Sequence, residues 1–310
     1  MALLFAITRE DYRLELAIIE DFQLQSQHIL CVGSGGCTPL SLKTCLPELK
    51  ITVFDFNPDQ LEHIQQKQST VAKGDKKQLD QLNQKGEFES LFRILRKTWL
   101  EFICDKQELQ KYFHVETSHK KRVQLVQQWL ENKYWLAPFH CSMNDAFLHQ
   151  MFTEKATQHA GPNSYPPYFS KVIQNGLLHK DGYKNPFLQH ILLESFIEKD
   201  APPYYKRPQS LDLQLLLCGI EALPPLTQTG FISLSNILDW SDSKQVKLWM
   251  NRFKELPNGS IILIRQLNNI TNWDPIFYPY FIRLDSTKYQ GIDRSLFYNQ
   301  IVLYQRTTSS

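Results

Sequence analysis

The chain has 310 residues, of which 42% are hydrophobic, 21% charged and 12% aromatic. These values are typical of a globular protein with room for about two domains, and they exclude a disordered or collagen-like chain. The formal net charge of +2, from 34 basic and 32 acidic side chains, argues against a dedicated nucleic-acid-binding protein.

Neither a membrane span nor a metal site is predicted. The longest apolar runs, at 215–217 and 261–264, fall far short of the roughly 20 residues that cross a bilayer. The apolar segment 1–7 lacks the basic start and the small-residue cleavage site of a signal peptide. The six cysteines form no CxxC pair, and no two histidines have the spacing of a helical metal site. We therefore expect a cytoplasmic protein with reduced cysteines and no metal.

The first predicted unit is a strand followed by a glycine-rich loop and a helix. The apolar run 28–32 predicts the strand, and Pro39 stands where proline is favoured at the start of a helix. Only 12 glycines occur in the chain, yet Gly33, Gly35 and Gly36 fall between these two elements. Such a loop lets the backbone approach a ligand, although a tight turn without any ligand produces the same pattern.

A second strand, predicted at 51–54, ends in Asp55, and Asn57 begins another helix. A carboxylate in this position can accept hydrogen bonds from both hydroxyls of a ribose. The loop reads GSGGC instead of GxGxxG, which favours a nucleoside ligand without a pyrophosphate. The order of the elements therefore predicts a nucleoside site, for a ligand such as S-adenosyl-L-methionine.

Residues 76–210 are predicted to form a mainly helical insertion. We expect this region to bind the acceptor, that is, the substrate other than the nucleoside. Helices are expected at about 87–104, 106–113, 119–133 and 141–157. The first is amphipathic with basic edges, so it either packs on the sheet or lies on an anionic membrane surface. Two clusters of proline and tyrosine, in loops at 165–169 and 202–205, predict either the walls of a pocket or rigid surface connections.

The remaining strands are predicted late in the chain. Apolar runs at 213–218, 230–234 and 260–264 follow the pattern of strands, and a helix is expected between 239 and 256. Segments 277–282 and 295–304 are typical of a hairpin that closes the sheet. The expected fold is therefore α/β, with a Rossmann-like doubly wound sheet formed by residues 1–75 and 211–310 and interrupted by the helical insertion at 76–210.

Eight short motifs follow one another along nearly the whole chain: Arg9-Glu10-Asp11, Ser34-Gly35-Gly36-Cys37, Asp55-Phe56-Asn57-Pro58-Asp59-Gln60-Leu61, Phe92-Arg93-Ile94-Leu95, Asn185-Pro186-Phe187-Leu188, Pro202-Pro203-Tyr204, Asp239-Trp240 and Asp293-Arg294-Ser295. In this order they resemble the S-adenosylmethionine:diacylglycerol 3-amino-3-carboxypropyltransferases, which begin betaine-lipid synthesis, and their uncharacterised relatives. The resemblance implies a Rossmann-like fold, S-adenosyl-L-methionine as ligand and transfer of its aminocarboxypropyl group to a lipid hydroxyl.

Position in the predicted fold selects the candidate cofactor-binding residues. The backbone of the glycine loop is expected to hold the adenosine and the amino-acid arm, Asp55 to bind the ribose, and Ile220 to lie beside the adenine. Asn57 fits either a contact to the ligand or a helix cap. The full set is Gly33, Ser34, Gly35, Gly36, Asp55, Asn57, Ile220, Ser235 and Asn236.

The candidate catalytic residues are Asp239, Asp11 and Arg9. Asp239 and Trp240 follow the fourth strand, at the sheet edge where ligands of open α/β sheets bind, although Asp239 also fits a helix cap. Arg9 is placed either to clamp the carboxylate of the arm or to form an exposed ion pair. The acceptor hydroxyl needs a general base, for which Asp239, Asp11, His140, His179 and Asp181 qualify by residue type.

Three functions fit these observations. Attack on the γ carbon of the amino-acid arm would transfer the 3-amino-3-carboxypropyl group to a lipid or another small hydroxyl acceptor and release 5′-methylthioadenosine. Attack on the methyl group would instead make the protein an ordinary methyltransferase. Loss of the acceptor site would leave a non-catalytic nucleoside-binding protein. Brief peripheral contact with a membrane is compatible with the composition, and a nucleic-acid partner is not expected.

Overall fold

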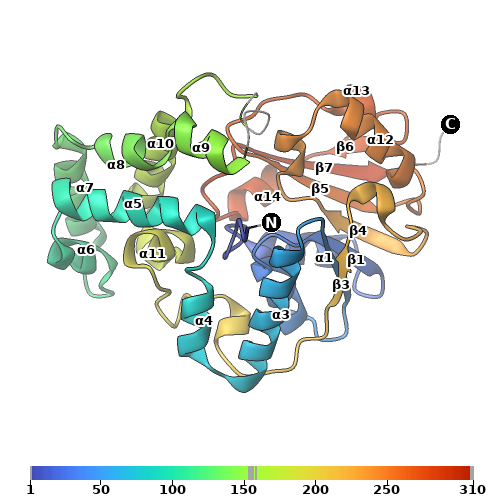
Figure 1. Ribbon diagram of the computed structural model, residues 1–310, viewed down its shortest axis with the longest axis horizontal. Helices are drawn as coiled ribbons and strands as arrows, with labels where there is room; N and C mark the ends of the chain where they lie inside the picture. Colours follow the sequence, from blue (N-terminus) through green and yellow to red (C-terminus); the bar gives the residue numbers. More distant parts are fainter. Residues whose placement is uncertain (1, 153–156, 158, 308–310) are drawn as a thin grey trace.

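The computed structural model describes residues 2–152, 157 and 159–307, which form an α/β protein around one seven-stranded mixed sheet (Figure 1). The strand order is β3-β2-β1-β4-β5-β7-β6. The first five strands in this order are parallel, and β7 runs antiparallel between β5 and β6. The strands are β1 (His28–Val32), β2 (Lys50–Asp55), β3 (Gln214–Leu217), β4 (Thr229–Ser233), β5 (Ile261–Gln266), β6 (Phe281–Leu284) and β7 (Gln300–Arg306).

Helices cover both faces of this sheet because alternate strand residues point to opposite sides. On β5, Ile261 and Leu263 belong to one core, whereas Ile262 and Ile264 belong to the other. The first core receives α1 (Tyr12–Asp21), α2 (Cys37–Cys45), α3 (Pro58–Lys73) and α14 (Thr287–Ile292). The second receives α12 (Ser243–Phe253) and α13 (Asp274–Phe277).

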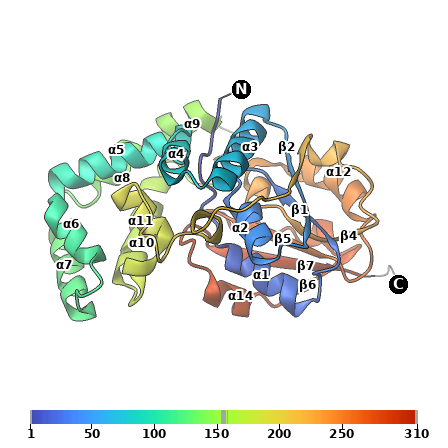
Figure 2. The same ribbon diagram turned by 90° about the horizontal axis from the view of Figure 1, so that it is seen from below.

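The segment between β2 and β3 adds a separate helical body with its own core, which lies to one side of the sheet (Figure 2). Buried aromatic side chains, among them Trp99 and Trp129 in edge contact, fill this third core. The helices that contribute to it are α5 (Glu87–Phe102), α6 (Lys106–Phe113), α7 (His119–Glu131), α8 (Ala137–Ser142), α9 (Asp145–Phe152), α10 (Tyr165–Leu178) and α11 (Pro186–Leu193), while α4 (Lys76–Leu82) packs against α3.

The five predicted strands before the terminal segments and the helices at 87–104, 106–113 and 119–133 agree with the structure to within a few residues. The two terminal strands pair antiparallel, but they begin at 281 and 300 instead of 277 and 295, and α14 lies between them, so they do not form a simple hairpin. The single helix predicted at 141–157 is wrong, because α8 ends at Ser142 and the side chain of Asn144 accepts the N–H of Phe147 at 3.0 Å to begin α9. The last part of that predicted helix, 153–156, lies outside the described residues. The cluster 165–169 is also not a loop: it begins α10, with its prolines in the first turn where they cost no hydrogen bond.

None of the helices in the described part of the chain combines the length and the apolar character needed to cross a bilayer.

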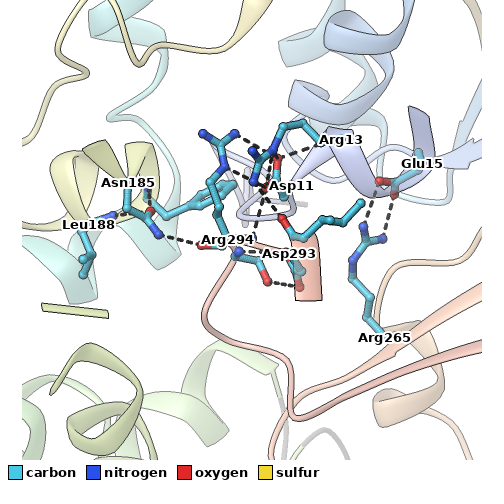
Figure 3. Close-up of polar contacts among 11 residues, drawn as sticks. Asp11, Arg13, Glu15, Asn185, Leu188, Arg265, Asp293 and Arg294 are labelled. Atoms are coloured by element: carbon cyan, nitrogen blue, oxygen red, sulfur yellow. Dashed lines mark hydrogen bonds and ion pairs between the residues drawn. The ribbon is translucent and has the colours of Figure 1, made fainter. Parts of the chain in front are cut away.

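Asp11 joins three segments that are far apart in the sequence (Figure 3). Its buried carboxylate caps α1 and accepts hydrogen bonds from Arg13 Nη2 at 2.7 Å and Arg294 Nε at 2.9 Å. The carbonyl of Arg294 accepts the side-chain amide of Asn185 at 2.9 Å, and the Asn185 Oδ1 caps α11. The start of α1, the helical insertion and the chain before β7 are therefore held at one point.

A second buried ion pair fixes α1 to the sheet. Arg265 on β5 is fully buried and donates both terminal nitrogens to Glu15, at 2.7 and 2.9 Å (Figure 3). Its Nη1 also lies 3.3 Å from Glu10. Because an unpaired charge is costly in such a place, these contacts strongly restrict the path of residues 10–15.

Replacing Asp11 is expected to destabilise the fold. Burial alone would raise the pKa of Asp11, but the hydrogen bonds from Arg294 and Arg13 outweigh it and lower that pKa below 3.8. The ionised carboxylate therefore stabilises the folded state above pH 4, and this contribution is lost as the pH falls through the lowered pKa. We expect Asp11→Asn to reduce the free energy of unfolding in urea at pH 7 by about 2 to 3 kcal/mol, and by less at pH 3.5.

The matched control is Asp21→Asn, at the exposed end of the same helix, where Asp21 pairs with Lys288. A surface pair of this kind contributes about 1 kcal/mol or less. Equal losses in the two variants would contradict the role given to Asp11.

Candidate functional site

A cavity of about 560 Å³ lies at the carboxyl ends of the five parallel strands, between the sheet and the helical insertion. After β1 the chain builds β2 and β3 on one side, and β4 and β5 then lie on the other side of β1. The loops that follow β1 and β4 diverge at such a point, which is where open α/β sheets bind ligands. The volume is in the range of small-molecule sites.

The glycine loop after β1 is shaped mainly by neighbouring protein segments. A Cβ on Gly33 would lie 2.8 Å from Asp55 Oδ2, and a Cβ on Gly35 would lie 2.5 Å from the backbone at Ile7 and Thr8. Gly36 has a φ of +74° and packs on α3. These glycines therefore let the second strand, the N-terminal segment and α3 approach the loop closely.

Ser34 is the one residue of this loop that lines the cavity. It has a φ of 45°, and Ser235 after β4 and Asn268 after β5 also have positive φ, at 54° and 49°. Left-handed backbone in a residue other than glycine costs free energy, on the order of 1 to 2 kcal/mol. Three such residues after neighbouring strands mark this edge of the sheet as a functional-site candidate.

Asp55 ends β2 at the floor of the cavity. Its two carboxylate oxygens accept the N–H groups of Asn57 at 2.9 Å and Ser34 at 3.1 Å, which leaves lone pairs for a ligand. Burial raises the pKa of Asp55, and the two N–H groups oppose that change. Phe56, directly beside it, lines the cavity with 66% of its surface exposed, so an aromatic face is available next to the carboxylate.

The amide of Asn57 is used within the protein. Its Oδ1 caps α3 by accepting the N–H of Asp59 at 3.0 Å, and its Nδ2 donates to the carbonyl of Ala2 at 2.9 Å. Of the two interpretations of Asn57, these contacts favour the helix cap. Gln60, one turn later, accepts the N–H of Phe5 at 3.0 Å and donates to the carbonyl of Phe5 at 2.9 Å. These two hydrogen bonds hold the N-terminal segment against the cavity.

Arg9 brings an incompletely paired guanidinium to the cavity. Its Nη1 donates to Glu89 of α5 at 2.9 Å, and its charge lies 4.2 Å above the ring of Phe92. Nε and Nη2 are buried and have no hydrogen-bond partner in the structure. These two nitrogens form one edge of the guanidinium, the edge that binds a carboxylate in bidentate fashion.

Asp239 is a buried carboxylate of the cavity that is suited to take up a proton. It lines the cavity with 3% of its surface exposed and accepts hydrogen bonds from the N–H of Leu267 at 2.8 Å and from Asn269 at 2.7 Å. Burial raises the pKa of Asp239 to about 7, although these hydrogen bonds oppose the rise. A carboxylate with such a pKa can act as a general base near neutral pH.

The helical insertion supplies a histidine to the same edge. The Nδ1 of His159 lies 3.1 Å from the carbonyl oxygen of Asp239, and Nε2 lies 3.0 Å from the hydroxyl of Tyr165. Burial lowers the pKa of His159, which favours the neutral ring. Nε2 also lies 3.2 Å from the carbonyl oxygen of Leu267, and the hydrogen bonds to the two carbonyls oppose the lowering of the pKa. These contacts join the insertion to the Asp239 turn and to the end of β5.

One wall of the cavity is aromatic. Trp240 meets Phe152 edge to face with ring centroids 4.6 Å apart, and Phe5 stacks on Phe152 at 5.6 Å. The rings come from three segments, the N-terminal chain, α9 and the loop after β4. An apolar group is therefore expected to bind on this side.

Carboxyl groups outnumber guanidinium groups in the lining of the cavity. Among the described residues they are four carboxylates and one guanidinium: Glu10, Asp55, Glu221, Asp239 and Arg9. A cavity of this kind favours a cationic ligand and opposes a pyrophosphate.

Eight of the twelve predicted site residues line this cavity: Arg9, Ser34, Asp55, Asn57, Ile220, Ser235, Asn236 and Asp239. Gly33, Gly35 and Gly36 only shape the loop. Asp11 lies outside the cavity with both oxygens bound to guanidinium groups, so it does not qualify as a general base. His140 and His179 are exposed and Asp181 pairs with Lys184, all outside the cavity lining.

Sequence reasoning missed several lining residues, notably Gln60, His159 and Tyr298. Gln60 stands inside a motif already singled out, three residues after a helix cap, and its position could have been noticed. His159 has no pattern around it that distinguishes it from the other eight histidines.

Comparison with known proteins finds no matching family model, curated protein or solved structure. The function is therefore inferred from the geometry and the charges of the cavity.

The raised pKa of Asp239 predicts how stability changes with pH. Between about pH 4 and pH 7 the folded state holds a proton on Asp239 that the unfolded state has lost, so the carboxylate makes the protein less stable as the pH rises. Asp239→Asn lacks this titration. The free energy of unfolding of the variant minus that of the wild type should therefore increase from pH 4.5 to pH 8.5, by roughly 4 kcal/mol at most.

Urea unfolding at the two pH values measures this difference, with Asp181→Asn outside the cavity as the control. A difference between Asp239→Asn and the wild type that stays constant with pH would show that Asp239 titrates normally.

Proposed function

We propose that the protein is an S-adenosyl-L-methionine-dependent transferase that moves the 3-amino-3-carboxypropyl group to the hydroxyl of a lipid. The observation that carries the proposal is the cavity at the carboxyl edge of the sheet, which has four carboxylates, one guanidinium and an aromatic wall. S-adenosyl-L-methionine has a net positive charge, whereas the pyrophosphate of a dinucleotide is anionic. The charges of the cavity favour the former.

The sheet supports a ligand with one nucleoside. The order β3-β2-β1-β4-β5 is that of a doubly wound, Rossmann-like sheet, but an antiparallel strand follows where the dinucleotide-binding fold continues with a sixth parallel strand. Asp55, Phe56 and Ile220 line the cavity. Asp55 would accept hydrogen bonds from the ribose hydroxyls, and Phe56 and Ile220 would offer apolar surfaces to the adenine. The residues present therefore fit an adenosine at this edge.

The reaction assigns a task to each group. S-adenosyl-L-methionine, when bound, supplies an electrophilic γ carbon whose bond to sulfur breaks as 5′-methylthioadenosine leaves. Arg9 holds the carboxylate of the arm through its unpaired edge. Asp239 removes the proton of the acceptor hydroxyl as its oxygen bonds to the γ carbon. The electron pair of the broken bond would stay on sulfur, which would become neutral.

The aromatic wall supports an acceptor with an apolar body. Phe5, Phe152 and Trp240 meet beside Asp239, so a hydroxyl that reaches this carboxylate would place its attached chain against these rings. Burial there also removes water, which would otherwise compete with the acceptor.

Small-molecule mass spectrometry distinguishes the candidate reactions. Incubation of the purified protein with S-adenosyl-L-methionine and a total lipid extract should produce 5′-methylthioadenosine above a protein-free control, together with a lipid that carries the aminocarboxypropyl group. S-adenosylhomocysteine as the product would instead identify a methyltransferase. Binding without any product would indicate a nucleoside-binding protein.

The role of Asp239 predicts a pH profile. Because the base must be ionised, kcat/KM should rise through an apparent pKa of about 7. Asp239→Asn should lower kcat by about a hundredfold or more and remove this rise. His140→Gln, at an exposed position outside the cavity, is the control and should leave both unchanged. A normal profile in Asp239→Asn would assign the base to another group.

A further inference from the structure

Glu10 is a cavity carboxylate whose charge is poorly balanced. It is buried and shares one guanidinium, that of Arg265, with Glu15. Glu15 takes two contacts from Arg265, at 2.7 and 2.9 Å, whereas Glu10 has a single longer one of 3.3 Å. Two carboxylates thus face one cation, and Glu10 is the less compensated of the two.

The other groups around Glu10 do not supply the missing positive charge. Its remaining hydrogen bonds come from the neutral hydroxyls of Ser235 and Tyr298, the latter at 3.2 Å. The charged or titratable groups near it are Arg265 on β5, Glu15 on α1, Tyr298 before β7 and Cys31 on β1. Burial raises the pKa of Glu10, Arg265 opposes this and Glu15 adds to it.

Arg9, the residue before Glu10, has hydrogen-bond donors that lack acceptors. Its Nε and Nη2 are buried donors without an acceptor, and Arg9 and Glu10 both line the cavity. An unmatched pair of donors and an unmatched carboxylate in one cavity fit a ligand that carries a carboxylate and an ammonium group close together. The α-amino-acid end of S-adenosyl-L-methionine is such a ligand.

We propose that Glu10 binds the α-ammonium group of the amino-acid arm, so that Arg9 and Glu10 together recognise its zwitterionic end. This inference rests on the proposed function and adds the residue that selects the amino group. The ligand would bring the cation that the two carboxylates lack. Ligands without the amino-acid arm would gain nothing from Glu10.

Calorimetric titration with three ligands tests the inference without any turnover. S-adenosyl-L-methionine has the arm and a sulfonium, S-adenosylhomocysteine has the arm and a neutral sulfur, and 5′-methylthioadenosine has no arm. Glu10→Gln keeps the size of the side chain, and the amide oxygen can still accept from Ser235 and Tyr298. We expect this variant to bind the first two ligands between about tenfold and a hundredfold more weakly, and the third with unchanged affinity.

Asp55→Asn is the matched control, because its ribose contact is common to all three ligands, and it should weaken all three alike. The unchanged affinity of Glu10→Gln for 5′-methylthioadenosine also shows that the variant is folded. A loss confined to S-adenosyl-L-methionine would place Glu10 beside the sulfonium and overturn the inference. An equal loss for all three ligands, or no loss, would overturn it as well. If the wild type binds none of the three, the proposed function itself fails.

Discussion

The whole site depends on buried ion pairs that fix residues 9–15 between the sheet and the helical insertion. Asp11 is bound by guanidinium groups from both ends of the chain, and Arg265 binds Glu15 in bidentate fashion on β5. Breaking such contacts leaves a charge away from water, so alternative paths for this segment are strongly disfavoured. As a result Arg9 and Glu10, whose own partners are incomplete, are held at the cavity.

The sheet and the insertion each supply part of the site. The strand ends provide Asp55 and Asp239, while the insertion contributes Glu89, which holds Arg9, and His159, which contacts the turn of Asp239. The proposed nucleoside side of the cavity is formed by the sheet alone. The aromatic side has rings from both bodies, so this part of the cavity requires the helical insertion as well as the sheet.

Sequence patterns predicted the parts of the structure that are determined locally. The strand, glycine loop, helix and second strand with Asp55 follow from turn chemistry and periodicity, and so do the first long helices of the insertion. Roles that depend on distant partners were not predictable. Gly35 serves the approach of the N-terminal segment, and Asp11 is committed to Arg294, 283 positions away. His159 reaches the cavity through packing that no local pattern signals.

The account rests on an adenosine bound at Asp55 with its amino-acid arm directed to Arg9. A crystal structure of the protein with S-adenosylhomocysteine tests this most directly. The account predicts that both ribose hydroxyls contact Asp55, that the arm lies between Arg9 and Glu10, and that the sulfur faces Asp239. A ligand bound elsewhere, or one whose ribose makes no contact with Asp55, would contradict it.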